Sequence, residues 1–189
     1  MEAGVFYHIY NRGNNRQLIF FEEENYHYFM RRFSKHLLPY IDLYAYCLMP
    51  NHFHFLIKFK GESNDISEEQ LEMISESFRI FFMSYAKSIN KKYKRTGSLF
   101  QRKFKSKPVL EESYFSTVVQ YFHFNPVKAG LCKKPKDWKF SSYNSIISTK
   151  PTNLKRDEVL KWFGGVENFI KTHNDRMLDI EMIEALLFK

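Results

Sequence analysis

Residues 46–56 read YCLMPNHFHFL, and this stretch predicts a β-hairpin. Pro50 and Asn51 would form its turn, because proline fixes its own φ angle and asparagine tolerates unusual backbone angles. The apolar residues on either side extend the two predicted strands to 41–48 and 52–60. The rest of the fold is predicted outward from this hairpin.

Two histidines follow the turn at positions i and i+2. On a strand, His52 and His54 would point to one face, whereas Phe53, Phe55 and Ile57 would point to the other. Two imidazoles on one face can hold a metal ion and leave its other positions open. A His-x-His pair is also common as two half-buried, hydrogen-bonded histidines, so the pair alone leaves both interpretations open.

The composition indicates a basic, aromatic-rich domain of ordinary size. The 189 residues are 44% hydrophobic, which is enough for a sizeable core. Lysine and arginine total 29 against 21 acidic residues, and a net charge of +8 favours a polyanionic partner. Most of the 20 phenylalanines must fill the core, but the 12 tyrosines also suit base stacking on single-stranded nucleic acid.

Targeting signals and cysteine frameworks are not expected. Cys47 and Cys132 have no paired spacing, so we expect neither a disulfide framework nor a cysteine-based zinc site, and a reducing cytoplasm fits. The N-terminus lacks a basic region followed by an apolar run, which predicts no signal peptide. Since no apolar stretch approaches membrane-spanning length, no membrane partner is expected.

Alternation and helical periodicity predict the remaining elements. We expect strands at 5–11 and 99–105, helices at 22–38, 66–93 and 111–124, and helical segments at 156–163, 166–173 and 177–188. This order of elements, which is strand, helix, hairpin, helix, strand and helix, implies an α+β fold of ferredoxin-like type. Its antiparallel sheet would carry helices on one face and be followed by a helical C-terminal extension.

The polar face of the helix predicted at 111–124 carries a second set of candidates. Tyr121 and Asn125 are four residues apart and would lie one above the other, with Lys128 nearby. His123 would point nearly opposite to Tyr121, which makes it a poorer candidate. The residue before Pro126 avoids the α region, so Asn125 is also predicted to end the helix or cap a fresh turn. Tyr121 could equally sit at a core boundary.

Two further segments suit nucleic-acid phosphates. In the loop at 11–16, Gly and Asn permit positive φ, and the amides and guanidinium groups match phosphate oxygens. Between 91 and 105, basic residues alternate with aromatic ones, although a charged run is usually solvated surface. Candidate nucleic-acid contacts are Arg12, Asn14, Arg16, Arg95, Arg102, Lys103, Lys105 and Lys128.

Four blocks of sequence, in order, resemble one family. They are YHIYNRGN at 7–14, MPNHFH at 49–54, GSLFQ at 97–101 and YFHFNPVKAGL at 121–131. Together they are similar to the REP-associated tyrosine transposases, which belong to the single-tyrosine HUH superfamily of insertion-sequence transposases. The resemblance covers residues 5 to about 145, and implies a transposase domain at 1–145 with the helical extension at 146–189.

The resemblance implies a mechanism. His52 and His54 would bind a divalent cation, Mg²⁺ or Mn²⁺, and Asn125 would complete the site at a position that is often glutamine in the superfamily. Single-stranded DNA would be cut at or near a folded hairpin. Tyr121 would attack the phosphorus, become linked to the 5′-phosphate and release a 3′-hydroxyl. Attack by another 3′-hydroxyl would rejoin the strands.

Other functions remain open at this stage. A domesticated single-stranded nucleic-acid-binding protein would keep the basic and aromatic surface without needing Tyr121. A replication initiator or relaxase carries related histidine motifs, but the sequence NPVKAG at 125–130 argues against these enzymes. A metal-dependent hydrolase would cut without a protein adduct. Both a homodimer with the tyrosine supplied in trans and a site within one chain fit the superfamily.

Overall fold

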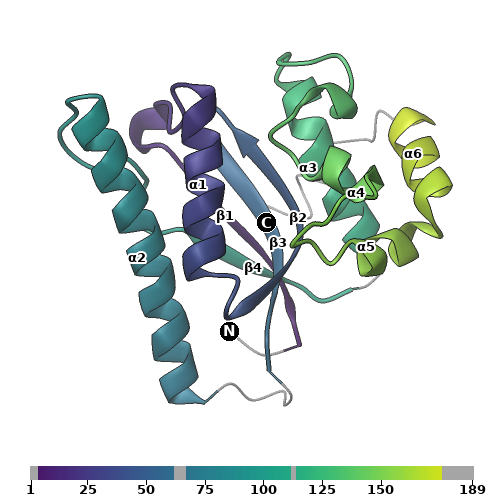
Figure 1. The fold of residues 1–189 in the computed structure, drawn as a ribbon, viewed down its shortest axis with the longest axis horizontal. Coiled ribbons are helices and arrows are strands. Elements are labelled where there is room, and N and C mark those ends of the chain that lie inside the picture. The colour runs from purple at the N-terminus through teal and green to yellow at the C-terminus, as the bar shows by residue number, and fades with distance from the viewer. Residues whose placement is uncertain (1–3, 62–66, 112–113, 176–189) are drawn as a thin grey trace.

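A computed structural model describes residues 4–61, 67–111 and 114–175 of the chain. Its centre is a four-stranded antiparallel sheet with the strand order β2-β3-β1-β4 (Figure 1). The strands are β1 (Phe6–Arg12), β2 (Ile41–Met49), β3 (His52–Phe59) and β4 (Lys105–Val109). This order and the two crossover helices confirm the predicted ferredoxin-like α+β fold, and the hairpin β2-β3 lies where the sequence placed it.

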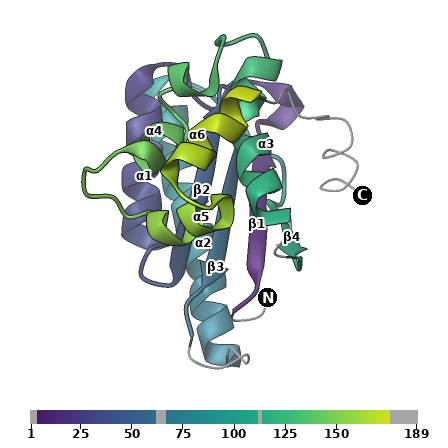
Figure 2. The same ribbon diagram turned by 90° about the vertical axis from the view of Figure 1, so that its right-hand side faces the viewer.

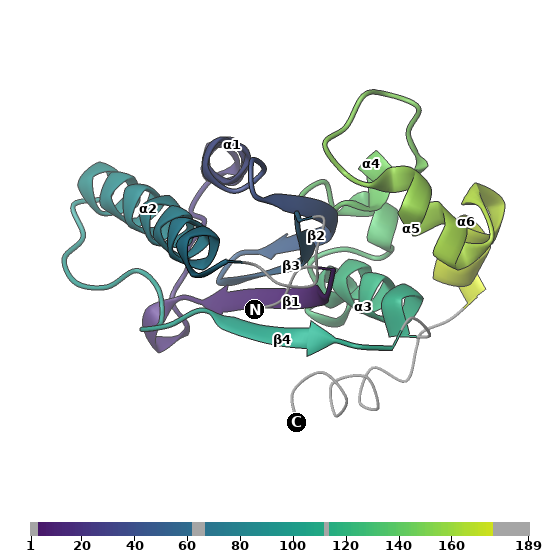
Figure 3. The same ribbon diagram turned by 90° about the horizontal axis from the view of Figure 1, so that it is seen from below.

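The two crossover helices, α1 (Glu23–His36) and α2 (Glu68–Lys92), cover one face of the sheet (Figure 3). Phe29 of α1 is fully buried between Phe53 of β3 and Phe81 of α2, with ring centroids 5.3 and 4.8 Å away. Phe55 packs on Phe33 at 4.4 Å. The predicted alternation along β3 is therefore confirmed, because its phenylalanines face this aromatic core.

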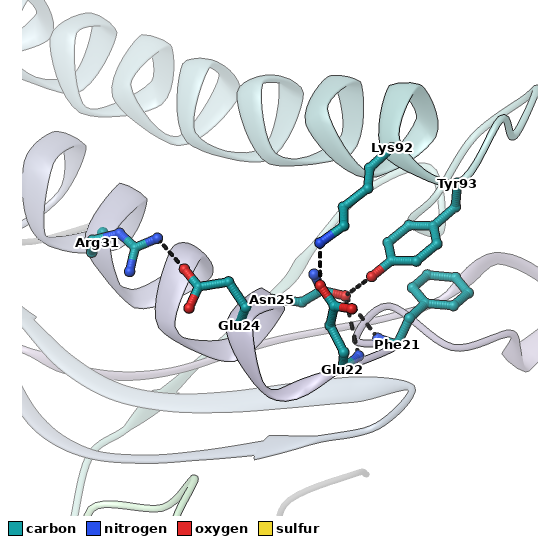
Figure 4. Close-up of polar contacts among 7 residues, drawn as sticks. All are labelled: Phe21, Glu22, Glu24, Asn25, Arg31, Lys92 and Tyr93. Atoms are coloured by element: carbon teal, nitrogen blue, oxygen red, sulfur yellow. Dashed lines mark hydrogen bonds and ion pairs between the residues drawn. The ribbon is translucent and has the colours of Figure 1, made fainter.

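Capping interactions fix where both helices begin. Ser67 accepts a hydrogen bond from the backbone of Gln70, whose side chain accepts one from the Ser67 backbone, as in a capping box. The start of α1 is joined to the end of α2 (Figure 4). Buried Asn25 accepts hydrogen bonds from the Phe21 backbone and the Tyr93 hydroxyl, and Lys92 pairs with Glu22.

A second helical layer covers the opposite face (Figures 2 and 3). It consists of α3 (Phe115–Lys128) and the helices α4 (Tyr143–Ile147), α5 (Arg156–Phe163) and α6 (Val166–Asp175). Phe6 of β1 packs against Phe115 of α3 and Trp162 of α5. The helical segment predicted at 177–188 lies outside the described residues. None of the helices within the described ranges combines the length and apolar character that a membrane span requires.

Two predicted boundaries are wrong. Instead of a strand at 99–105, Leu99 and Phe100 are buried, Phe100 makes one isolated bridge to Gly13, and the fourth strand is β4. As an edge strand, β4 tolerates Pro108. Similarly, α3 does not end at Asn125 but continues through Pro126 to Lys128. Pro126 is buried, and tertiary packing outweighs its local preference.

Candidate active site

A pocket of about 650 Å³ lies between the sheet and α3. Its walls come from β1, β3, α3, the end of β2, the start of β4 and the loop before β4. The lining residues are Tyr10, Asn11, Arg12, Met49, His52, Phe53, His54, Gln101, Lys105, Tyr121, Asn125, Lys128 and Ala129. The pocket thus gathers residues that are more than a hundred positions apart in the sequence.

Both histidines of the hairpin reach this pocket from β3. His52 is opposite Arg12 in the β1–β3 register, and His54 is opposite Tyr10. Their ring centroids are 5.1 Å apart, with the rings nearly perpendicular. His54 is almost completely buried, with 3% of its surface exposed, and His52 is partly buried.

The polar contacts of these histidines use the same ring atom. His52 Nδ1 lies 2.6 Å from the side-chain oxygen of Asn51, and His54 Nδ1 lies 2.8 Å from Nε2 of His8. His54 Nε2 is buried and has no hydrogen-bond partner in the described part of the chain. The Nε2 atoms are therefore the ring positions available to a ligand in the pocket.

Burial keeps these imidazoles neutral. Burial, followed by the charge of Arg12, lowers the pKa of His52 to about 4. The pKa of His54 is also lowered well below its ordinary value, mainly by burial. Burial and then Lys107 lower the pKa of His8 to about 3. Neutral imidazole is the form that binds a metal ion, so protons do not compete for these nitrogens near pH 7.

Tyr121 and Asn125 enter the pocket from α3. The Tyr121 ring meets the His54 ring edge-on, with centroids 5.8 Å apart, and is buried. The side-chain nitrogen of Asn125 donates to the Tyr121 carbonyl oxygen at 2.8 Å. This bond leaves the side-chain oxygen of Asn125 as the end of the amide that could bind a cation.

The candidate nucleic-acid contacts divide into three groups, of which the first two line hollows. Arg12, Lys105 and Lys128 line the pocket itself, and the Lys105 ammonium lies 5.8 Å from the Tyr10 ring centroid. Arg102 and Lys103 line a neighbouring hollow of about 730 Å³. The two hollows share Asn11 and Gln101 in their walls, so they are adjacent.

The remaining contacts lie in or beside the loop after β1. Asn14 and Arg16 are exposed in a short 3₁₀ turn, and Arg95 donates to Gln17 at 2.9 Å. The predicted positive φ angles occur at Asn15 and Arg16 rather than at Gly13. Gly13 is required for another reason, because a Cβ there would lie 2.0 Å from the Gln17 carbonyl oxygen.

Three residues of this region had no predicted site role. His8, Tyr10 and Gln101 either line the pocket or contact its histidines. The alternation of the sequence at 7–10 placed His8 and Tyr10 on one face of a strand. Only the pairing of β1 with β3 shows that this face is the one that carries His54.

Within the described residues, no group of three His, Cys, Asp or Glu side chains is arranged to hold a metal ion. A cation held by His52 and His54 would therefore need oxygen ligands. The Asn125 amide, water and substrate phosphate are oxygen donors of the kind that Mg²⁺ and Mn²⁺ accept. Two neutral imidazoles with open neighbouring positions fit such an ion.

Comparisons with known proteins agree on one family. The sequence pattern of the family described as "Transposase IS200 like" matches residues 3–125. A Haemophilus influenzae protein, provisionally named a REP-associated tyrosine transposase, is 27% identical over 109 residues, which are 56% of this chain and 61% of that protein. The chain thus spans about three fifths of the length of this curated relative.

One solved structure has the same fold. It is described as a REP-associated tyrosine transposase bound to a REP hairpin. It superposes with a TM-score of 0.57, covering 80% of this chain and 84% of that chain at 18% identity. At this identity the similarity shows a shared fold and carries no residue roles.

Proposed function

Because the chain belongs to the IS200-like transposase family, we propose that it cleaves and rejoins single-stranded DNA at hairpin-containing repeats. The proposed intermediate is a covalent bond between Tyr121 and a 5′-phosphate. One observation carries the proposal: Tyr121 and Asn125 of α3 share a single pocket with His52 and His54 of β3. The hairpin bound by the solved relative supports the choice of substrate.

The proposed reaction exchanges one phosphodiester bond for another. The Tyr121 hydroxyl loses its proton to solvent as its oxygen bonds to phosphorus. The bond from phosphorus to the 3′-oxygen breaks, and this oxygen takes up a proton to become a 3′-hydroxyl. Because the phosphotyrosine retains the energy of the bond, a second 3′-hydroxyl can reverse the step without a nucleotide cofactor.

A divalent cation, Mg²⁺ or Mn²⁺, is proposed at His52, His54 and Asn125. When bound, it would polarise the phosphate and stabilise the charge that develops there, which helps a weak nucleophile such as tyrosine. Around it, Arg12, Lys105 and Lys128 would bind the phosphates of the strand and hold the scissile one near the Tyr121 hydroxyl.

The pocket is formed within one chain. Tyr121 meets His54 of the same chain, with the ring centroids 5.8 Å apart, which supports attack by a tyrosine in cis. A homodimer is compatible with this arrangement but is not needed to complete the site. We place the reaction in the cytoplasm, where the DNA substrate lies.

The test is the capture of a covalent complex on a denaturing gel. The protein is incubated with single-stranded hairpin DNA from the repeats that flank its own gene, labelled on the 3′ side of the cut, with Mg²⁺ or Mn²⁺. We expect a shifted band that chelator and Tyr121→Phe both abolish. Tyr143→Phe is the matched control, because Tyr143 is equally buried but lies in α4, outside the pocket.

Two other results would reject strand transfer by Tyr121. Specific cleavage without a shifted band would identify a hydrolase. Tight, salt-sensitive binding with no cleavage across several repeats would identify a single-stranded nucleic-acid-binding protein, which is the alternative function.

A further inference from the structure

We infer that His8 is a positioning residue: it accepts a hydrogen bond from His54 Nδ1 and so directs the lone pair of His54 Nε2 into the pocket. Asn51 does the same for His52. The inference rests on the metal site of the proposed function. It explains why the Nε2 atoms of these two imidazoles offer a lone pair, which can bind a cation, rather than an N–H group, which cannot.

The fold holds His8 and His54 together. In the β1–β3 register, His8 pairs with Leu56 and lies diagonally across from His54. The two rings are stacked with centroids 5.1 Å apart, and His8 is fully buried. Phe122 of α3 packs against both rings, at 5.0 and 5.3 Å. The pair therefore has little freedom to reorient.

One proton is shared along the 2.8 Å contact between His8 Nε2 and His54 Nδ1. If His8 donated it, a neutral His54 would carry its own proton on Nε2 and present an N–H to the pocket, which cannot bind a cation. If His54 donates it, His54 Nε2 keeps a lone pair. Since this buried Nε2 has no other hydrogen-bond partner in the described part of the chain, a cation is well suited to satisfy it.

Asn51 fixes the second imidazole without this ambiguity. Its side-chain oxygen lies 2.6 Å from His52 Nδ1, and its side-chain nitrogen donates to the Arg16 carbonyl oxygen at 3.2 Å. An amide oxygen can only accept, so His52 Nδ1 must carry the proton and Nε2 must carry the lone pair. Metal-binding histidines commonly donate their other N–H to such an acceptor, and losing the acceptor weakens metal affinity by about 10–100-fold.

The test compares two substitutions of His8 in the full chain by titration with Mn²⁺, followed by electron paramagnetic resonance of the free ion. His8→Leu removes the acceptor, and we expect the Kd for Mn²⁺ to rise by about 10–100-fold. His8→Gln supplies an amide oxygen as acceptor and should restore most of the affinity. Urea unfolding of each variant verifies that it is folded.

A matched control is available in a second buried histidine pair. His123 Nδ1 and His173 Nε2 are 2.9 Å apart, outside the pocket. His173→Leu should destabilise the fold but leave the Kd for Mn²⁺ unchanged. If His8→Leu keeps the wild-type affinity, or loses no more than His173→Leu does, His8 is merely a core residue and the inference is wrong.

Nuclear magnetic resonance gives a readout that does not depend on any variant. With ¹⁵N-labelled histidine and Mg²⁺, we expect the proton on His54 Nδ1 and a scalar coupling across the hydrogen bond to His8 Nε2. A proton on His54 Nε2 would overturn the inference even if His8→Leu did not fold. Failure of the proposed metal site is distinguishable from failure of the inference about His8 alone, because the wild type would then bind no Mn²⁺. In that case the inference would also be wrong.

Discussion

A buried chain of hydrogen bonds makes the stability of this protein depend on pH. His173 of α6 donates from Nδ1 to the Phe169 carbonyl oxygen at 2.8 Å. Its Nε2 therefore accepts from His123 Nδ1, and His123 Nε2 lies 2.8 Å from the Ser142 hydroxyl. The only other ionisable ring against His173 within the described residues, Tyr143, is neutral near pH 7. Protonating His173 would put an uncompensated charge into this buried network.

The magnitude follows from the pKa. Burial lowers the pKa of His173 from 6.5 to about 4 in the folded protein. The unfolded chain takes up this proton below about pH 6.5, whereas the folded protein does not until about pH 4, so stability is present above pH 6.5 and is lost as the pH falls. At pH 5 the difference is about 1.5 pH units, or about 2 kcal/mol from this one residue.

The assay is urea unfolding at pH 7.5 and pH 5.0 for the wild type and His173→Gln, whose amide cannot titrate. We expect the wild type to lose about 2 kcal/mol more than the variant between these pH values. Tyr143→Phe is the control, because Tyr143 packs against His173 and burial raises its pKa above the ordinary value of 10.0, so its loss should not change the pH dependence between these values. Equal losses in the wild type and His173→Gln would refute the reasoning.

Three other predictions concern packing and DNA binding. Phe29→Ala should lower the free energy of unfolding by about 3–5 kcal/mol in urea, because the ring is fully buried among aromatic neighbours; a loss under 1 kcal/mol would contradict this. Gly13→Ala should cost about 1–3 kcal/mol by the same measurement, since its Cβ would meet the Gln17 carbonyl oxygen, and wild-type stability would refute the clash. For single-stranded DNA, the logarithm of the binding constant should fall with the logarithm of salt concentration, by about 0.7 per phosphate contact. Arg102→Gln removes one such contact and should make the slope shallower by about 0.7. A flat salt dependence in the wild type would reject the proposal that these basic residues bind phosphates.

Local sequence patterns were sufficient for the hairpin and for the start of α2. Alternation alone assigned the faces of His52, His54 and Phe53, because successive side chains on a strand must point to opposite sides. The helix predicted at 66–93 begins close to its expected position, because Ser67 and the acidic residues after it satisfy the first amides of the helix. Both features depend only on neighbours in the sequence.

Features that depend on distant residues could not be predicted. A helical wheel gave the face that Tyr121 shares with Asn125, but not the side of the sheet on which α3 packs. Likewise, β4 is a strand because β1 offers it a free edge, and Pro108 obscures this in the sequence. Alternation places His8 on the same face of its strand as Tyr10, but its contact with His54 depends on the register between β1 and β3.

The most direct test of the central claim is to locate the covalent bond. The adduct with hairpin DNA would be trimmed with nuclease, digested with trypsin and analysed by fragmentation mass spectrometry. No lysine or arginine separates Tyr114 from Tyr121, so both fall in the tryptic peptide 106–128, and the fragment ions must distinguish them. We predict a nucleotide joined through its 5′-phosphate to Tyr121. A nucleotide on Tyr114 or on any other residue, or cleavage with no modified peptide, would contradict the account.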